Sequence, residues 1–226
     1  MRVDPFALSF RLAFWCTLLM VPVGLVLGRT LARWRSGLVP WLEAVLLLPL
    51  VLPPTVIGYY LLVWLSPGSV LGGWLDARVP GGVVFAFPGL LIASLVVNLP
   101  FAVQPLSQAF AALPRELSEA ARVSGLGPLA TFFRVELPLV WPALLGAAAL
   151  VFAHTLGEFG VVLMIGGNIE GSTRTVSIAI YDAVQSFEPT RASRYSLALL
   201  VLSLACLALV RFGARRGSAG PGGATR

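Results

Sequence analysis

The residues of this chain that could perform chemistry are few, and their types argue against catalysis. The 226 residues include one histidine, two cysteines and no lysine, so all 16 basic residues are arginine. A zinc site needs several His or Cys ligands, and a phosphate-binding P-loop needs the lysine of G-x-x-x-x-G-K-S/T. We therefore expect no metal site, no cofactor and no ATP-binding site in this chain, and we expect that it is not an enzyme.

One polar segment has a spacing that predicts docking into a partner. Pro114 can open a helix with acidic residues in its early turns, where they suit the positive end of the helix dipole. Its alanines allow close backbone approach, and Gly125 permits a turn that a side chain would block. The alternative is an ordinary amphipathic helix in a surface loop. The candidate docking residues are Glu119, Ala120, Ala121, Arg122, Ser124, Gly125 and Leu126.

A second group of candidates interrupts apolar segments. Pro53 and Pro54 predict a broken helix, and such breaks face protein or water because lipid cannot satisfy the exposed backbone groups. Thr55 and Gly58 follow the break, so these four residues are candidates for a pathway wall; a purely structural kink is the alternative. Glu158 lies one turn after His154 inside another apolar segment, where an ionisable group is functional or paired. We expect it to act in gating, in a backbone hydrogen bond or in a pair with His154.

A third group follows the end of that segment. Asn168, Thr173 and Arg174 offer an amide, a hydroxyl and a guanidinium, which could meet an anion or a delivering protein. For Arg174 the alternative is an ordinary surface charge. Glu43 and Asn98 are polar residues within apolar segments, and we expect them to hold helices together.

Composition assigns the chain to a membrane. It is 58% hydrophobic and 12% charged, with a mean hydropathy of +0.89, whereas about a quarter of a soluble domain is charged. A helix of roughly 20 apolar residues spans the hydrocarbon core. The five segments long enough to do so are 9–27, 39–65, 83–103, 137–157 and 195–211. The first is followed at once by arginines and has no small-residue cleavage site, so we expect it to be retained rather than removed as a signal peptide.

The arginines predict the orientation. Ten of them fall on one side of the membrane if the N-terminus is outside, and six fall on the other. Because positive charge collects on the inner side, this favours an N-terminus outside and a C-terminus inside. We expect a transmembrane domain over residues 1–216, with an inner loop at 105–136, and a disordered Gly-rich tail at 217–226. A basic stripe on a soluble domain is missing from the sequence pattern, so nucleic acid is not an expected partner.

The spaced motif resembles a known family. Glu119-Ala120-Ala121, Gly125, Val135 and Leu137-Pro138 match the signature of permease subunits of binding-protein-dependent ABC importers, although that family usually has Ile where this chain has Val135. Further motifs look like the permease of molybdate importers, with Glu170 where relatives commonly have Pro. Together with the loop they cover most of residues 48–182. These motifs are 48–59, Leu156-Gly157-Glu158-Phe159-Gly160, Asn168-Ile169 and Thr173-Arg174-Thr175.

The resemblance implies an architecture and partners. It implies an all-α polytopic protein of the MetI-like type I fold, with five transmembrane helices and a cytoplasmic coupling helix that sits in a cleft of an ATPase. It further implies a homodimer in the cytoplasmic inner membrane, in contact with lipid, two ATPase subunits that hydrolyse ATP inside, and a substrate-binding protein outside. The cargo would be molybdate, with tungstate, sulfate or another oxyanion as alternatives.

Two other functional classes remain as alternatives. An intramembrane enzyme would need a nucleophile near the single histidine, and Ser124 lies in the polar loop, remote in topology from His154. An ion-driven secondary transporter usually shows inverted repeats, and we find none in the sequence. Copurification of an ATPase would separate these readings.

Overall fold

In the computed structural model the described residues are 4–217, without the side chains of residues 115 and 209–217. The tail was expected to be disordered at 217–226; Gly217 is instead the last residue of α11, and residues 218–226 lie outside the described part of the chain. The described elements are helical: α1 (Pro5–Arg33), α2 (Val39–Val51), α3 (Pro54–Leu65), α4 (Val70–Asp76), α5 (Phe87–Ala111), α6 (Arg115–Val123), α7 (Pro128–Thr131), the π-helix η1 (Phe132–Glu136), α8 (Leu137–Gly157), α9 (Gly160–Gly166), α10 (Val176–Gln185) and α11 (Pro189–Gly217).

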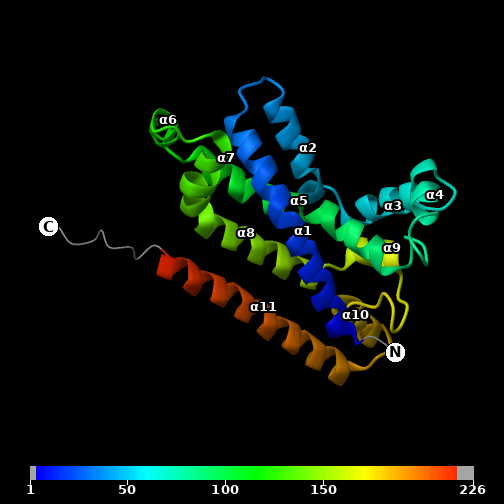
Figure 1. Cartoon of the computed structure of the whole chain (residues 1–226). Helices are drawn as coiled ribbons and strands as arrows, with labels where there is room; N and C mark the ends of the chain where they lie inside the picture. The colour runs from blue at the N-terminus through cyan, green and yellow to red at the C-terminus, as the bar shows by residue number, and fades with distance from the viewer. Residues whose placement is uncertain (1–3, 218–226) are drawn as a thin grey trace.

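The centre of the bundle consists of α1, α5 and α8, which pack against one another (Figure 1). α11 lies along α8 on the outside, α2 packs on α5, and α3 pairs with the short helix α9. The loop after α1, together with α6 and α7, lies at one end of the bundle, which we call the coupling end. The N-terminus and α10 lie at the opposite end.

Two glycines allow α1 to approach α5 closely. A Cβ on Gly24 would lie 2.8 Å from the carbonyl oxygen of Ala102, and one on Gly28 would lie 2.9 Å from the amide nitrogen of Ser107. The two glycines are four residues apart and therefore share one face of the helix. Small residues at this spacing let membrane helices pack backbone to backbone. The main chains of α1 and α5 are therefore in close contact.

The number of spans agrees with the expectation of five. Within the described residues four helical runs are long and apolar enough to cross a membrane, and α2 with α3 makes a fifth if this bent pair counts as one span. The two helices meet at an angle of 106°. Pro53 precedes α3 and Pro54 is its first residue, where a proline is tolerated because that position has no intrahelical N–H bond to lose. The predicted break in this segment is confirmed.

The ends of the other spans differ from the sequence estimate. The third span begins at Phe87 rather than at residue 83, because Gly81, Gly82 and Phe85 adopt positive φ and keep the preceding turn non-helical. The fourth run begins at Pro128 rather than at residue 137. Helix continues through residues that are too polar to be counted by hydropathy, so the spans reach beyond their apolar centres.

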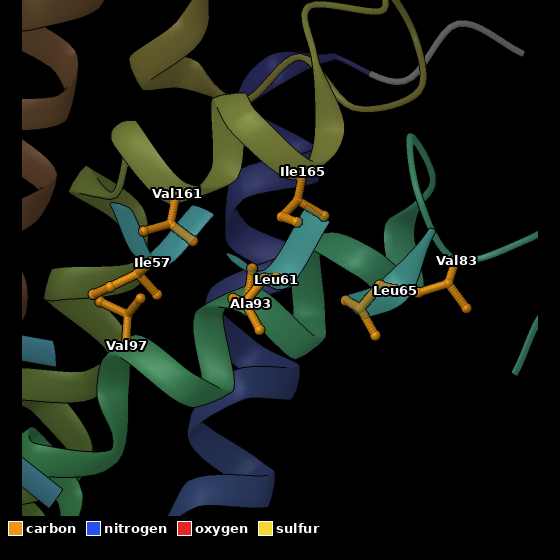
Figure 2. Packing of buried hydrophobic residues seen from close by; sticks show 8 residues of the cluster. All are labelled: Ile57, Leu61, Leu65, Val83, Ala93, Val97, Val161 and Ile165. Atoms are coloured by element: carbon orange, nitrogen blue, oxygen red, sulfur yellow. The ribbon is translucent and has the colours of Figure 1, made fainter. Parts of the chain in front are cut away.

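A buried cluster joins the elements at the end opposite α6. Ile57 and Leu61 of α3 lie beside Val97 and Ala93 of α5, with Val161 and Ile165 of α9 in the same cluster (Figure 2). Leu65 of α3 lies beside Val83, which precedes α5. Helix α3 is therefore anchored on one side by protein after the sharp bend. Its other side carries exposed aromatic residues, Tyr59, Tyr60 and Trp64.

Replacing Gly28 by alanine should destabilise the folded protein. The added methyl group would meet backbone atoms of α5 that cannot move aside, and overpacking of this kind costs about 1–3 kcal/mol. Thermal unfolding of the detergent-solubilised protein would measure the loss. Gly146→Ala in α8 is the matched control, because a Cβ there meets nothing within 4 Å. Equal stability of the two variants would contradict the close packing of α1 on α5.

Candidate functional site

The segment predicted to dock forms α6, and its end is a Schellman motif. The amide of Gly125 donates to the carbonyl of Arg122 at 2.9 Å, and the amide of Leu126 donates to the carbonyl of Ala121 at 3.0 Å. Gly125 has φ of +81°, in the left-handed region where a side chain is strained. The predicted helix that opens after Pro114 and stops at Gly125 is confirmed.

Helix α6 turns one face toward the bundle and the other outward. Ala121 is buried, whereas Glu119, Ala120, Arg122 and Ser124 are exposed and Leu126 is half-buried. Two apolar side chains stand out on the same end of the molecule, because Val123 is 90% exposed and Leu129 of α7 is 75% exposed. The docking role of these residues stays a prediction, and this surface suits it.

A basic cavity of about 500 Å³ lies between α6 and the last turns of α1. Its charged and hydroxyl-bearing lining residues are Arg29, Arg33, Arg35, Arg122, Ser118, Glu119 and Thr131. Side chains that border the cavity, rather than direct helix packing, therefore make the connection between α6 and α1.

The connection centres on Glu136, whose side chain is 1% exposed. Its Oε2 accepts from Nε of Arg29 at 2.7 Å, and its Oε1 accepts from Nη2 of Arg33. Nη2 of Arg33 also donates to Oγ of Ser118 in α6 at 3.1 Å. One buried carboxylate thus joins the end of α1 to the start of α8 and to α6.

A π turn places this carboxylate. The amide of Leu137 donates to the carbonyl of Phe132, five residues earlier, so the turn holds one residue more than an α-helical turn. Pro138 follows and has no N–H to donate, which removes the next regular bond of the ladder. Such π turns are frequent at functional sites. Here the extra residue brings Glu136 under the arginines of α1.

Sequence reasoning did not identify this group. It used Arg29 and Arg33 only to orient the chain and to argue that the first span is retained, and it did not weigh Glu136 at all. The available signals were an acidic residue directly before Leu137-Pro138 and two arginines spaced by four at the end of the first span. The sequence does not predict the π turn, and this turn determines the direction of the carboxylate.

The residues predicted for the pathway around the broken span fall into two environments. Pro53, Pro54 and Thr55 are exposed in the single chain, and Pro54 also packs on α9, since a Cβ on Gly160 would lie 2.6 Å from Cβ of Pro54. Gly58 is buried instead, with Cβ of Met164 2.6 Å from where its own Cβ would be. Gly58 therefore serves the packing of α3 on α9, while Thr55 remains open to a pathway.

Glu158 lies next to this break and is 8% exposed. Its Oε1 accepts from the amide of Val161 at 3.3 Å, in the first turn of α9, and its Oε2 lies 3.8 Å from Nε2 of His154. The ring of His154 is stacked at a tilt on Phe101, with centroids 4.3 Å apart. The expected backbone hydrogen bond and the expected proximity to His154 are both present in the structure.

The third predicted group lies beyond the other end of α9. Nε of Arg174 donates to Oδ1 of Asn168 at 2.5 Å, and Nδ2 of Asn168 donates to Oδ1 of Asp182 at 2.9 Å. Arg174 Nη1 also lies 3.5 Å from Asp182 Oδ2. Thr173 is buried, and its hydroxyl donates to the carbonyl of Gly166 at 2.6 Å. The loop is thus closed on itself, with its cation already paired.

Another polar feature contains Glu43, which the sequence analysis considered, and residues of α5 that it did not consider. A cavity of about 150 Å³ lies between α2 and α5, and its polar lining residues are Glu43, Gln104, Ser107 and Gln108. Gln104 and Gln108 are spaced by four and share one exposed face of α5. Asn98, which was expected to hold helices together, donates from Nδ2 to Oγ1 of Thr155 in α8 at 3.1 Å. Residues 4–217 contain no cluster of three His, Cys, Asp or Glu side chains arranged for a metal ion.

Known proteins resemble this chain in sequence and in fold. The chain is 44% identical to the molybdenum transport system permease protein ModB of Azotobacter vinelandii over 94% of each chain. Its fold is similar to a chain in the crystal structure of a bacterial alginate ABC transporter in complex with an alginate-bound periplasmic protein. That alignment has a TM-score of 0.76 and 17% identity, and covers 94% of this chain and 77% of the other.

A second solved structure has the same fold. It is the MetNI methionine ABC transporter in inward-facing conformations, with a TM-score of 0.66, 20% identity, and 93% and 91% of the two chains covered. The expected all-helical, MetI-like fold is confirmed. The sequence profile described as "Binding-protein-dependent transport system inner membrane component" matches residues 20–216. This chain therefore belongs to that family, and it is a multi-pass membrane permease rather than an enzyme.

Proposed function

We propose that this chain is the permease subunit of an ABC importer that carries molybdate, or the related oxyanion tungstate, across the cytoplasmic membrane. The observation that carries the proposal is the 44% identity to a molybdenum permease over almost the whole of both chains. The alternative is a permease for sulfate or another oxyanion, because these anions share charge and tetrahedral shape.

The energy would come from separate ATPase subunits that bind at the coupling end. Helix α6 offers them an exposed surface of charged and apolar side chains, with Glu119, Arg122 and Val123 on it. A single chain has one such helix, so a symmetric pair of chains is needed to engage two ATPases. The binding protein would dock at the opposite end of the bundle.

The pathway would run along the face that α2 and α5 leave uncovered. All 13 residues of α2 are at least partly exposed in the single chain, and the amides of Gln104 and Gln108 are directed to the same side of the bundle. Amide N–H groups can bind an oxyanion without trapping it, whereas a free arginine would hold it strongly. A second copy of the chain would close this face.

The cycle is then a two-state shift. Nucleotide binding brings the two ATPases together, and the two coupling helices move with them. The permease changes from an inward-open to an outward-open form because the ATP-bound subunits bind the second form more tightly. The broken span and the hydrogen bond of Glu158 at the start of α9 lie where such a gate would open.

Substrate identity can be tested with the complete transporter in lipid vesicles. We expect the binding protein loaded with molybdate to stimulate ATP hydrolysis and uptake of labelled molybdate. If only the sulfate-loaded binding protein stimulated hydrolysis, the substrate would be sulfate instead. Uptake by the permease in the absence of any ATPase would contradict the proposal as a whole.

Gly125→Val should abolish transport while the protein still inserts into the membrane. The left-handed backbone disfavours a side chain by about 1–2 kcal/mol, and a β-branched one fits it worst, so the end of α6 would be displaced. Gly125→Asn should keep most of the activity, since Asn tolerates this conformation. Gly127→Val is the matched control, because Gly127 has φ of −68° and open space around it. Transport that survives Gly125→Val would count against docking through α6.

The orientation can be tested by thiol labelling of intact cells. Ser186→Cys lies on an exposed turn at the end opposite α6, and Gly37→Cys lies in the loop between α1 and α2. An N-terminus outside predicts that an impermeant thiol reagent labels the first variant and spares the second until the cells are opened. The parent chain serves as the background control, because it contains the buried Cys16 and the half-buried Cys206 of α11. The reverse pattern would invert the topology.

A further inference from the structure

The structure assigns a positioning role to Glu136. We propose that its ion pairs with Arg29 and Arg33, together with the contact of Arg33 with Ser118, form the link through which movement of α6 is transmitted to α1. The inference rests on the proposed function, because it concerns how an ATPase bound at α6 would act on the rest of the permease.

The first argument is that direct packing does not provide this link. The backbone of α6 contacts mainly α7 and η1, and the basic cavity of about 500 Å³ lies between α6 and α1. Arg33 reaches across from α1, with Nη2 3.1 Å from Oγ of Ser118 in α6. The same nitrogen donates to Glu136, and Oγ of Ser118 lies 3.5 Å from Oε1 of that carboxylate. A displacement of α6 therefore acts on α1 through these three side chains.

The second argument is that the link is stiff. The carboxylate of Glu136 is buried and has both oxygens engaged by arginines, so it has little freedom to rotate. The guanidinium of Arg29 lies over the ring of Phe132, 5.2 Å from its centroid. Phe132 in turn stacks on Phe110 of α5, with centroids 6.4 Å apart. The side chain of Glu136 is almost fully buried, so its ion pairs are weakened less by solvent than surface pairs are.

The third argument is that α1 can pass the movement on. Gly24 and Gly28 bring the main chain of α1 against that of α5. Helix α5 carries Gln104 and Gln108 on the proposed pathway face. A path of direct contacts thus runs from α6 through Glu136 to α1, and from α1 to the residues that would line the pathway.

The test uses the complete transporter and the variant Glu136→Gln, which keeps the shape of the side chain and removes its charge. We expect the ATPases to copurify as with the wild-type permease and to retain basal ATP hydrolysis. Stimulation of hydrolysis by the loaded binding protein should fall by about tenfold, within the range typical of coupling between distant sites. Arg33→Gln should have the same effect, and the double variant should lose no more than either single variant, since both act through one link.

Arg33→Gln also covers the case in which Glu136→Gln fails to fold, because Arg33 is 43% exposed and its loss leaves Arg29 to neutralise the carboxylate. Thr30→Val is the control: it removes an exposed hydroxyl that donates to the carbonyl of Val26 within α1, at the same end of the helix as Arg29 and Arg33 and away from the end where the binding protein would dock. Normal stimulation in the folded Arg33 and Glu136 variants would overturn the inference, and so would loss of ATPase copurification, which would make the group part of the docking surface. Failure of the wild-type permease to couple to any ATPase would instead refute the proposed function.

Discussion

In a bilayer every backbone N–H and C=O must find its partner within the protein, and this constraint organises the whole chain. The described residues meet it with helices, and the helical ladder is interrupted where polar groups are needed. The break at Pro53 exposes Thr55, the π turn before Leu137 carries Glu136, and the break after Gly157 carries Glu158. Each interruption costs regular hydrogen bonds and places a polar side chain that a straight helix would have directed elsewhere.

Charged side chains toward each end of the bundle also find their partners within the protein. At the coupling end one carboxylate is shared by two arginines, both of which keep part of their surface exposed. Near the opposite end Arg174 pairs with the carboxylate of Asp182 and donates to the neutral amide oxygen of Asn168, and Glu158 accepts from the amide of Val161 at the start of α9. Between them the polar group Asn98 with Thr155 ties α5 to α8. These charged groups each have a partner within the protein, whereas Asn98 and Thr155 join α5 to α8 by a neutral hydrogen bond.

Much of the fold follows from local sequence, and most of the site does not. Apolar runs determine the spans, Pro53-Pro54 determines the break, and Gly125 determines the end of α6, because each effect acts within a few residues. The predicted spans were shorter than the helices in the structure, because hydropathy detects the apolar centre of a helix and not the full length of its hydrogen-bonded backbone. The group around Glu136 unites residues more than 100 positions apart in the chain. Its geometry depends on helix packing and a π turn, which composition and spacing cannot reveal.

Helix α11 is mostly exposed on the surface of the single chain. Only 6% of its most apolar window is buried inside the single chain, and its neighbours are α8 and α10 along one side. Such a helix gains its stability from partitioning into lipid rather than from interlocking side chains. Its positions from Leu197 to Leu207 are consequently constrained in hydrophobicity but hardly in shape, so exchanges among leucine, valine, isoleucine and phenylalanine can accumulate there by neutral drift. The same exchanges in α1 or α5 would disturb a fitted core.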